Sequence, residues 1–458
     1  MLQKTIKKSI EISGFGLHNG KNVTIKLNPA KVDSGIYFIR KDLDLKSKIE
    51  ASINNVFKTY RATTLKKKNI EIKTTEHFLA ACWALSIDNL EVEINNEELP
   101  ILDGSSKGFT GIIKKTGIKE QNKKKNIFKI KNYIKVSDPK TGAFIECMPA
   151  NEFEINATVD YDSNTIKKQV INFNESEEFD KEIGPSKTFF LIKNSSNLKE
   201  INKIKGGNLE NAIIFLEEDI SKKEIDILKI NTNKKTFKKG ILNPEIMSFK
   251  DECVRHKILD IIGDLYLLQQ KIIGKIVAYK PGHSINIKLS QEIKKTMEKE
   301  MKGPPNYNFN EKPLMDIQKI KKILPHREPF LLIDEIRELE YNYVVGIKFV
   351  RKEEDYFRGH FPNEPVMPGV LQIEAMAQTG GILALNTVED PENYLTYFMK
   401  IDNVKFKQKV VPSDVLIFEL TLTSPIRRGI CQMYGKAYVN DKVVMEAELM
   451  AKIAKNDK

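Results

Sequence analysis

One long stretch in the last third of the chain, GVLQIEAMAQTGGILALN, carries a single charged residue, Glu374. Pro368 directly precedes this stretch, and proline suits the first turn of a helix, so we predict a helix from about Pro368 to Leu385. A helix that is apolar nearly all round must be buried. Apolar and mostly polar residues alternate over 443–451, which is typical of a strand. The last third is therefore predicted to be one long central helix wrapped by an antiparallel sheet.

Two polar stretches divide the chain, whose 458 residues suit roughly three domains of about 150 residues each. Residues 119–127 are charged, and residues 302–313 are rich in Pro and Asn and poor in core residues. Strands precede helices in both earlier segments, which predicts two similar α+β layers packed on each other. The predicted fold class is thus α+β. The predicted segments are a first subdomain at 1–120, a second at 121–301, a linker at 302–313 and a final domain at 314–458.

Charge and cysteine content argue against several classes of protein. The formal net charge is +12, but the lysines are scattered, and the most basic run, at 123–125, contains no aromatic residue. Without such a stacking platform we expect no binding of nucleic acid. None of the four cysteines forms a CxxC pair, so we expect neither a disulfide framework nor a structural zinc site. Because the chain has no long apolar run and no signal peptide, we expect a cytoplasmic protein without a membrane span.

A candidate metal site lies in the segment DECVRHKILDIIGD, where His256, Asp260 and Asp264 follow one another at intervals of four residues. On a helix these side chains share one face. His77, which follows Glu76 at the start of another predicted helix, would supply a third ligand. Three protein ligands and one open position are typical of catalytic zinc, and an adjacent carboxylate can then serve as the base. The alternative for His256 and Asp260 is a pair on the protein surface. The alternative for Glu76 is an acidic residue in the first turn of a helix, where the helix dipole favours it.

The residues around this site suggest hydrolysis of an amide. His283 follows a predicted strand in a Pro-Gly turn, which is a suitable position for a general acid. Asp264 would orient His283 or raise its pKa. Lys257 and Thr188 would stabilise the oxyanion that forms when water attacks the amide.

Seven motifs occur in order over about residues 1–300. They are GFGLHNG, KTTEHFLAA, LPILDGSS, KTFF, KGGNLENAIIF, VRHKILDIIGDL and AYKPGHSINIK. Together they closely resemble the zinc-dependent UDP-3-O-acyl-N-acetylglucosamine deacetylases of lipid A biosynthesis. The resemblance implies two α+β layers that sandwich the active site, with an insert in the second layer that forms a passage for the acyl chain.

The same resemblance assigns roles to residues of this chain. It implies one Zn²⁺ per chain, with Glu76 as general base and His283 as general acid. It also implies that Asp264 is the partner of His283, that Lys257 and Thr188 support the oxyanion or the substrate, and that Phe189 of the KTFF motif contacts the substrate. Lys187 stands where an Arg is more usual, and His18 is expected to be a structural turn residue. The implied zinc ligands are His77, His256 and Asp260.

A second candidate site surrounds Glu374 on the long apolar helix. Burial of a lone carboxylate is costly, so such a residue usually has a function. A buried Glu paired with a buried cation is the alternative, but this helix carries no Lys or Arg. His360, in a turn before a Pro-rich loop, can supply a base, and the N–H of Gly369 at the helix N-terminus can polarise a carbonyl oxygen. A base, an acid and an oxyanion donor are the groups needed to remove an α-proton and then a β-hydroxyl.

This stretch, with LPHREPFLLIDEI before it and VKFKQKVVPSD after it, strongly resembles the (3R)-hydroxyacyl-[acyl-carrier-protein] dehydratases of hotdog fold. The resemblance covers about residues 314–455. It implies that His360 removes the C2 proton and that Glu374 protonates the departing hydroxyl. In the family these two residues come from opposite protomers, which implies at least a homodimer, with a hexamer as the common assembly. His326 is expected to be structural.

The complete chain therefore resembles a fusion of two enzymes, with UDP-3-O-acyl-N-acetylglucosamine and (3R)-hydroxyacyl chains on acyl carrier protein as their substrates. One alternative stays open, in which one half is catalytic and the other is an assembly scaffold. Four basic residues are candidates for recognition of the acyl carrier protein, or else form a solvated basic face. They are Lys405, Lys407, Arg427 and Arg428.

Overall fold

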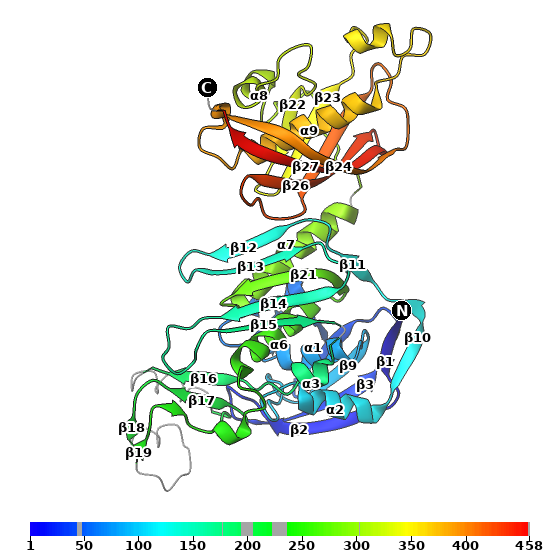
Figure 1. The fold of residues 1–458 in the computed structure, drawn as a ribbon. Helices are drawn as coiled ribbons and strands as arrows, with labels where there is room; N and C mark the ends of the chain where they lie inside the picture. The colour runs from blue at the N-terminus through cyan, green and yellow to red at the C-terminus, as the bar shows by residue number, and fades with distance from the viewer. Residues whose placement is uncertain (44–47, 176, 194–204, 222–235, 302, 457–458) are drawn as a thin grey trace. The chain divides into compact units, whose positions relative to one another are not determined.

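The structure is a computed structural model that describes residues 1–43, 48–175, 177–193, 205–221, 236–301 and 303–456. These residues form two compact units (Figure 1). The first comprises Met1–Lys129, Lys135–Glu146 and Ala150–Lys294, and the second comprises Ile130–Ile134, Cys147–Pro149 and Lys295–Lys458.

The first layer of unit 1 is a five-stranded sheet with strand order β2-β3-β9-β4-β5. Val23, Ile25 and Leu27 are buried on one face of β3, as their alternation with polar residues predicts. A short sheet of β6, β7 and β8 and a ribbon of β1 and β10 complete this part. The bounds are β1 Leu2–Ile6, β2 Ile10–Phe15, β3 Asn22–Pro29, β4 Ile36–Arg40, β5 Lys48–Glu50, β6 Val56–Lys58, β7 Thr64–Lys67, β8 Ile70–Ile72, β9 Leu90–Ile94, β10 Ile118–Lys124, and the helices α1 Glu76–Ala84 and α2 Lys107–Thr116.

The second layer of unit 1 is a sheet with strand order β12-β13-β21-β14-β15, in which β11 also pairs with β21. Two small sheets, one of β16, β17 and β20 and one of β18 and β19, also belong to this part of the chain. Residues 194–204 and 222–235 lie outside the described residues. The bounds are β11 Ile127–Lys129, β12 Ile134–Asp138, β13 Ala143–Met148, β14 Phe153–Val159, β15 Gln169–Asn174, β16 Phe189–Ile192, β17 Ile213–Leu216, β18 Ile220–Ser221, β19 Thr236–Phe237, β20 Gly240–Ile241, β21 Lys271–Tyr279, and the helices α3 Phe179–Glu182, α6 Glu252–Tyr266 and α7 His283–Met301.

Helices α1 and α6 pack against each other between the two sheets (Figure 1). Phe78 of α1 contacts Phe38 of the first sheet, with ring centroids 6.2 Å apart, and Trp83 contacts Phe153 of the second sheet at 5.3 Å. The two helices approach most closely at Gly263, where a Cβ atom would lie only 2.1 Å from the carbonyl oxygen of Glu76. This close approach brings the N-terminus of α1 against the C-terminal part of α6.

Unit 2 contains one six-stranded antiparallel sheet with strand order β22-β23-β25-β26-β27-β24 (Figure 1). Helix α9 lies against this sheet so closely that a Cβ atom at Gly346 would lie 2.5 Å from Thr379. The α+β fold class and the predicted long helix against an antiparallel sheet are confirmed. The bounds are α8 Ile317–Ile323, β22 Glu335–Leu339, β23 Tyr343–Phe349, α9 Gly369–Leu385, β24 Tyr394–Phe406, β25 Val415–Leu422, β26 Ile430–Val439 and β27 Lys442–Lys455.

The face of this sheet opposite α9 carries a second apolar cluster, which includes Tyr343, Val345 and Ile347. Tyr307 packs against this cluster, and the ring of Phe309 contacts that of Phe349 at 5.6 Å. The segment predicted to be a linker is thus packed onto the sheet of unit 2. No helix among the described residues is long and apolar enough to cross a membrane.

Candidate active sites

Three predicted metal ligands, His77 at the start of α1 and His256 and Asp260 on α6, lie together in the interior of unit 1. Their ligand atoms all lie within 4.8 Å of one another, and all three side chains are buried. Asp260 Oδ1 lies 3.5 Å from Nε2 of His256 and 4.0 Å from Nε2 of His77. The spacing of four residues on α6 and the close approach of α1 at Gly263 together produce this geometry.

The donor atoms of this cluster fit a divalent metal ion. Nδ1 of His256 lies 3.1 Å from the carbonyl oxygen of Ser186, so Nε2 is left to present its lone pair to the cluster. Burial lowers the pKa of His77 to about 3 and that of His256 to about 4, which keeps both rings neutral at pH 7. Oδ1 of Asp260 is buried without a hydrogen-bond partner among the described residues. A buried carboxylate oxygen that faces two neutral imidazoles is suited to Zn²⁺.

Glu76 lies beside this cluster and is almost completely buried. Its Oε2 accepts a hydrogen bond of 3.1 Å from the N–H of Thr63, and its Oε1 lies 3.8 Å from Nε2 of His283. Burial raises the pKa of Glu76 to about 7. A carboxyl group with such a pKa can accept and release a proton near neutral pH.

His283 is the first residue of α7 and also faces the cluster. Its Nδ1 lies 2.9 Å from Oδ2 of Asp264. The same Oδ2 accepts a hydrogen bond of 3.0 Å from Nδ2 of Asn286, and Oδ1 of Asp264 accepts one of 2.5 Å from Oγ1 of Thr63. Burial alone would lower the pKa of His283, but the negative charges of Asp264, Asp260 and Glu76 raise it to about 10. His283 therefore carries a proton at neutral pH.

Lys257 and Phe189 also lie beside the cluster, and Thr188 directly precedes Phe189. The ammonium group of Lys257 lies 2.7 Å from Oδ2 of Asp260 and 5.4 Å from the centre of the Phe189 ring. That ring is also edge-on to His256 at 6.1 Å, so Phe189 forms part of the wall. Thr188, the residue before β16, is half-buried and is held by a bond from its N–H to the carbonyl oxygen of Gly104 at 2.8 Å.

The sequence did not single out Thr63 or Asn286. Thr63 lies 201 residues before Asp264, so no local spacing could have indicated this contact. Asn286 follows His283 by one helical turn, and that spacing was an available signal. His18, expected to be structural, is fixed by a 2.8 Å bond from its N–H to Oε1 of Glu98, and its Nε2 is buried without a partner among the described residues.

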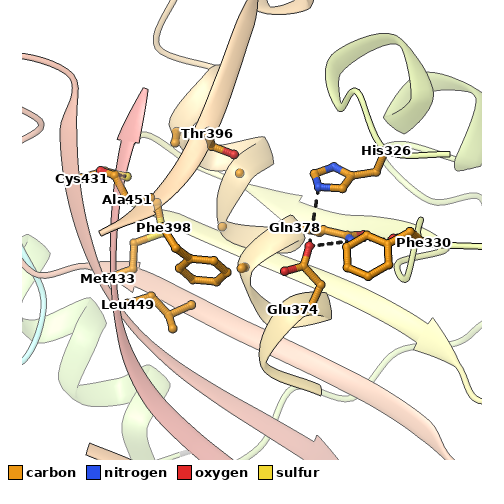
Figure 2. A pocket seen from close by; sticks show the side chains of 14 residues that line it. His326, Phe330, Glu374, Gln378, Thr396, Phe398, Cys431, Met433, Leu449 and Ala451 are labelled. Atoms are coloured by element: carbon orange, nitrogen blue, oxygen red, sulfur yellow. Dashed lines mark hydrogen bonds and ion pairs between the residues drawn. The ribbon is translucent and has the colours of Figure 1, made fainter. Parts of the chain in front are cut away.

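In unit 2, Glu374 lines a cavity of about 260 Å³ between α9 and the sheet (Figure 2). Oε1 of Glu374 accepts a 3.0 Å hydrogen bond from Nε2 of Gln378 and lies 3.6 Å from Nε2 of His326. The Glu374 side chain, which was expected to be buried, is 19% exposed in the single chain. The residues that line the cavity are His326, Phe330, Glu374, Ala377, Gln378, Gly380, Gly381, Ala384, Thr396, Phe398, Cys431, Met433, Leu449 and Ala451.

His360 is half-buried, and it is not among the residues that line this cavity of the same chain. Its Nδ1 lies 2.8 Å from the carbonyl oxygen of Val366, and its ring stacks on Phe361 at 4.1 Å. Gly369 begins α9, where the N–H groups of the first turn have no acceptor within the helix. A Cβ atom at Gly369 would lie 2.8 Å from the ring of Phe406.

The four basic candidates for recognition of the acyl carrier protein differ in their surroundings. Lys405 and Lys407 both pair with Glu446, at 3.4 and 3.0 Å. Arg427 and Arg428 lie in the turn between β25 and β26. The shared carboxylate reduces the positive charge that the two lysines offer to a partner.

Comparison with known proteins agrees with this division into two sites. Residues 3–229 and 234–295 match the family described as UDP-3-O-acyl N-acetylglycosamine deacetylase (LpxC), and residues 324–448 match the FabA-like domain family. The chain is 44% identical to the bifunctional enzyme LpxC/FabZ of Bacteroides thetaiotaomicron and 41% identical to that of Porphyromonas gingivalis, with 99% of each chain covered. It is 36% identical to the UDP-3-O-acyl-N-acetylglucosamine deacetylase of Myxococcus xanthus over 64% of this chain and 86% of that protein.

The chain therefore belongs to the family of bifunctional LpxC/FabZ enzymes. The predicted fusion of a deacetylase with a dehydratase is confirmed at the level of family and enzyme class.

Proposed function

We propose that unit 1 removes the N-acetyl group of UDP-3-O-acyl-N-acetylglucosamine with the help of zinc, and that unit 2 dehydrates (3R)-hydroxyacyl chains carried by acyl carrier protein. The observation that carries the first half is the buried group of three metal-ligating side chains with Glu76 and His283 beside it. The observation that carries the second half is a carboxylate, Glu374, inside an otherwise mostly apolar cavity. Both substrates combine a polar head with an acyl chain.

Deacetylation needs a nucleophile, an oxyanion site and an acid. A zinc ion held by His77, His256 and Asp260 would polarise the amide carbonyl and lower the pKa of the attacking water. Glu76 takes the proton of that water. The ammonium group of Lys257 and the hydroxyl of Thr188 stabilise the negative charge that develops on the carbonyl oxygen. The wall of the site around Phe189 would then determine which amides reach these residues.

His283 completes the reaction as general acid. Protonated at neutral pH, it delivers its Nε2 proton to the amine of the glucosamine as the C–N bond breaks, and acetate is released. Asp264 supports this role by holding Nδ1 of the ring, which leaves Nε2 to face Glu76 and the cluster. After release, the proton on Glu76 can return to His283, because Oε1 and Nε2 lie only 3.8 Å apart.

Dehydration needs a base and an acid on the two sides of the C2–C3 bond. His360 removes the C2 proton, Glu374 gives a proton to the departing C3 hydroxyl, and the N–H of Gly369 polarises the thioester carbonyl. The products are the trans-2-enoyl chain and water. His360 lies outside the cavity of its own chain, which supports a site that a second copy completes, with the His360 of that copy reaching the Glu374 cavity.

The surface of unit 2 supports assembly into at least a dimer. Strand β24 ends the sheet, so one side of its backbone is open to pairing. Its apolar side chains Tyr397, Phe398, Met399 and Ile401 are between 43% and 55% exposed, an arrangement that suits an interface. We expect a homodimer as the minimum and a hexamer as the assembly in solution, which light scattering of the full chain measures. The four buried free cysteines are in keeping with the expected cytoplasmic location.

One preparation of the full chain tests both halves. We expect acetate release from UDP-3-O-acyl-N-acetylglucosamine that a chelator abolishes and zinc restores, together with dehydration that the chelator leaves unchanged. Loss of one activity from folded, zinc-loaded protein would instead favour the scaffold alternative for that half. Acetate release that resists exhaustive removal of metal would contradict the zinc mechanism.

A further inference from the structure

His326 lies inside the dehydratase cavity beside Glu374, although its position in the LPHREPF motif suggested a structural residue. The ring is stacked on Phe330 with centroids 6.2 Å apart, and its side chain is 23% exposed. Figure 2 shows the ring directed toward the carboxylate, with Nε2 3.6 Å from Oε1 of Glu374. A structural role alone gives no reason for a titratable ring to face the proposed general acid.

The same carboxylate oxygen is already held by Gln378, whose own amide is fixed. Nε2 of Gln378 donates to Oε1 of Glu374 at 3.0 Å and to the carbonyl oxygen of Phe330 at 2.8 Å. Oε1 of Gln378 accepts from the N–H of Leu332 at 2.8 Å. Helix α9 and the loop at 326–332 therefore meet at Oε1 of Glu374. Figure 2 shows the other carboxylate oxygen directed away from His326 and Gln378.

The surroundings of the imidazole decide which of its nitrogens carries the proton. Nδ1 is buried and has no hydrogen-bond partner among the described residues. Burial lowers the pKa of His326, with Glu374 of α9 opposing this change and Arg327 of the same loop adding to it. The ring is accordingly neutral at neutral pH, and its proton is best placed on Nε2, where a carboxylate oxygen is the nearest acceptor.

We propose that His326 is a positioning residue of the dehydratase, whose Nε2–H holds Oε1 of Glu374 so that the other oxygen carries the proton to the leaving hydroxyl. This inference rests on the proposed role of Glu374 as general acid. As the proton moves from that oxygen to the C3 hydroxyl, the electron pair of the O–H bond stays on the carboxylate, and the electron pair of the breaking C3–O bond leaves with the water that forms. The negative charge then spreads to Oε1, where the N–H groups of His326 and Gln378 stabilise it.

The separation between Nε2 of His326 and Oε1 of Glu374 indicates the stage of the reaction at which their contact acts. A separation of 3.6 Å is longer than a hydrogen bond, but catalytic hydrogen bonds commonly tighten in the complex with substrate. The attraction also grows as charge develops on Glu374. An interaction that strengthens in the transition state affects kcat rather than KM.

Two substitutions in the full chain separate this role from a structural one. His326→Phe keeps a flat ring that can stack on Phe330 but removes the N–H donor, whereas His326→Gln restores an N–H donor without the aromatic ring. We expect kcat of dehydration to fall about 10- to 100-fold in H326F, because a hydrogen bond to a charged group is worth roughly 1.5–3 kcal/mol and about 1.4 kcal/mol is a factor of ten. KM for the acyl carrier protein substrate should stay within about threefold. H326Q should recover a large part of the lost kcat.

Several results would overturn the inference. Wild-type kcat in H326F would show that the contact has no role. An equal loss in both variants, or a loss confined to KM, would assign His326 to packing. The deacetylase rate of the same preparation controls for the amount of folded chain. Glu374→Gln separates the two proposals, because full activity in that variant would remove the role of Glu374 itself.

Discussion

Gly263 offers the most direct test of how the metal cluster is built, because it is the point at which α6 contacts α1. A Cβ atom at this position would lie 2.1 Å from the carbonyl oxygen, 2.8 Å from the carbonyl carbon and 2.9 Å from the Cα atom of Glu76. All three are backbone atoms, which cannot rotate away as a side chain can. Gly263→Ala must therefore separate the two helices.

The size of the separation follows from the contact distances. The closest contact must grow from 2.1 Å to at least the 3.0 Å that real Cβ atoms respect, a displacement of about 0.9 Å. His77 is carried by α1, and the other two ligands are carried by α6, so the displacement enters the ligand set directly. Zinc–ligand distances tolerate only about 0.2 Å. We expect zinc affinity to fall by at least about tenfold, and stability to fall by about 1–3 kcal/mol from overpacking.

The assay is competition for zinc with a chromophoric chelator, together with acetate release at saturating zinc. Gly111→Ala is the matched control, since Gly111 is exposed on α2 and an added Cβ there would meet nothing within 4 Å. That variant should keep zinc and gain about 0.5–1 kcal/mol of stability, as alanine does in a helix. Dehydratase activity of both variants should equal that of the wild type.

Wild-type zinc affinity and deacetylase rate in Gly263→Ala would refute the reasoning. Such a result would mean that the three ligands do not depend on the approach of α1 to α6. Loss of stability without loss of zinc affinity would have the same meaning, because the strain would then have been absorbed elsewhere.

Three further predictions concern the separation of the two sites and the support of the first. Glu76→Gln should lower acetate release by at least about 100-fold with dehydration unchanged, and Glu374→Gln should have the opposite effect, measured on one preparation of each variant. Thr63→Val removes the hydroxyl that donates to Asp264 and should lower the deacetylase kcat about tenfold or more, because a buried acceptor loses its partner; Thr64→Val is the neighbouring control. Removal of metal should lower the melting temperature of unit 1 but leave that of unit 2 unchanged, as differential scanning calorimetry can show.

Local patterns predicted the helices well, and their ends less well. The apolar stretch after Pro368 predicted the long helix to within a residue, because proline marks its start and most of the helix is buried. Helix α6 ends at Tyr266, although apolar residues continue to Leu268. The chain turns there through Gln269, whose φ is 56°, and no glycine or proline marks the change.

The site residues show the same division between local and long-range information. The pair His256 and Asp260 was predictable, because both lie on one helical face. The contacts of Thr63 with Asp264 and of His326 with Glu374 depend on how distant segments meet, 201 and 48 residues apart. No periodicity carries that information. The resemblance to known enzymes implied the reacting groups and Asp264, but Thr63 and the contact of His326 with Glu374 were found only in the three-dimensional arrangement.

The segment at 302–313 illustrates a limit of composition as a guide to domain boundaries. It is polar and rich in proline and asparagine, yet its Tyr307 packs against an apolar cluster and its Phe309 contacts Phe349. The hydroxyl of Tyr307 also donates to Glu338 at 2.5 Å, which fixes the segment to β22. A cut within this segment would expose the cluster around Tyr343 and Val345 and weaken the dehydratase for reasons unrelated to the fusion. A comparison of fused and separated enzymes measures coupling only if the whole packed segment stays with unit 2.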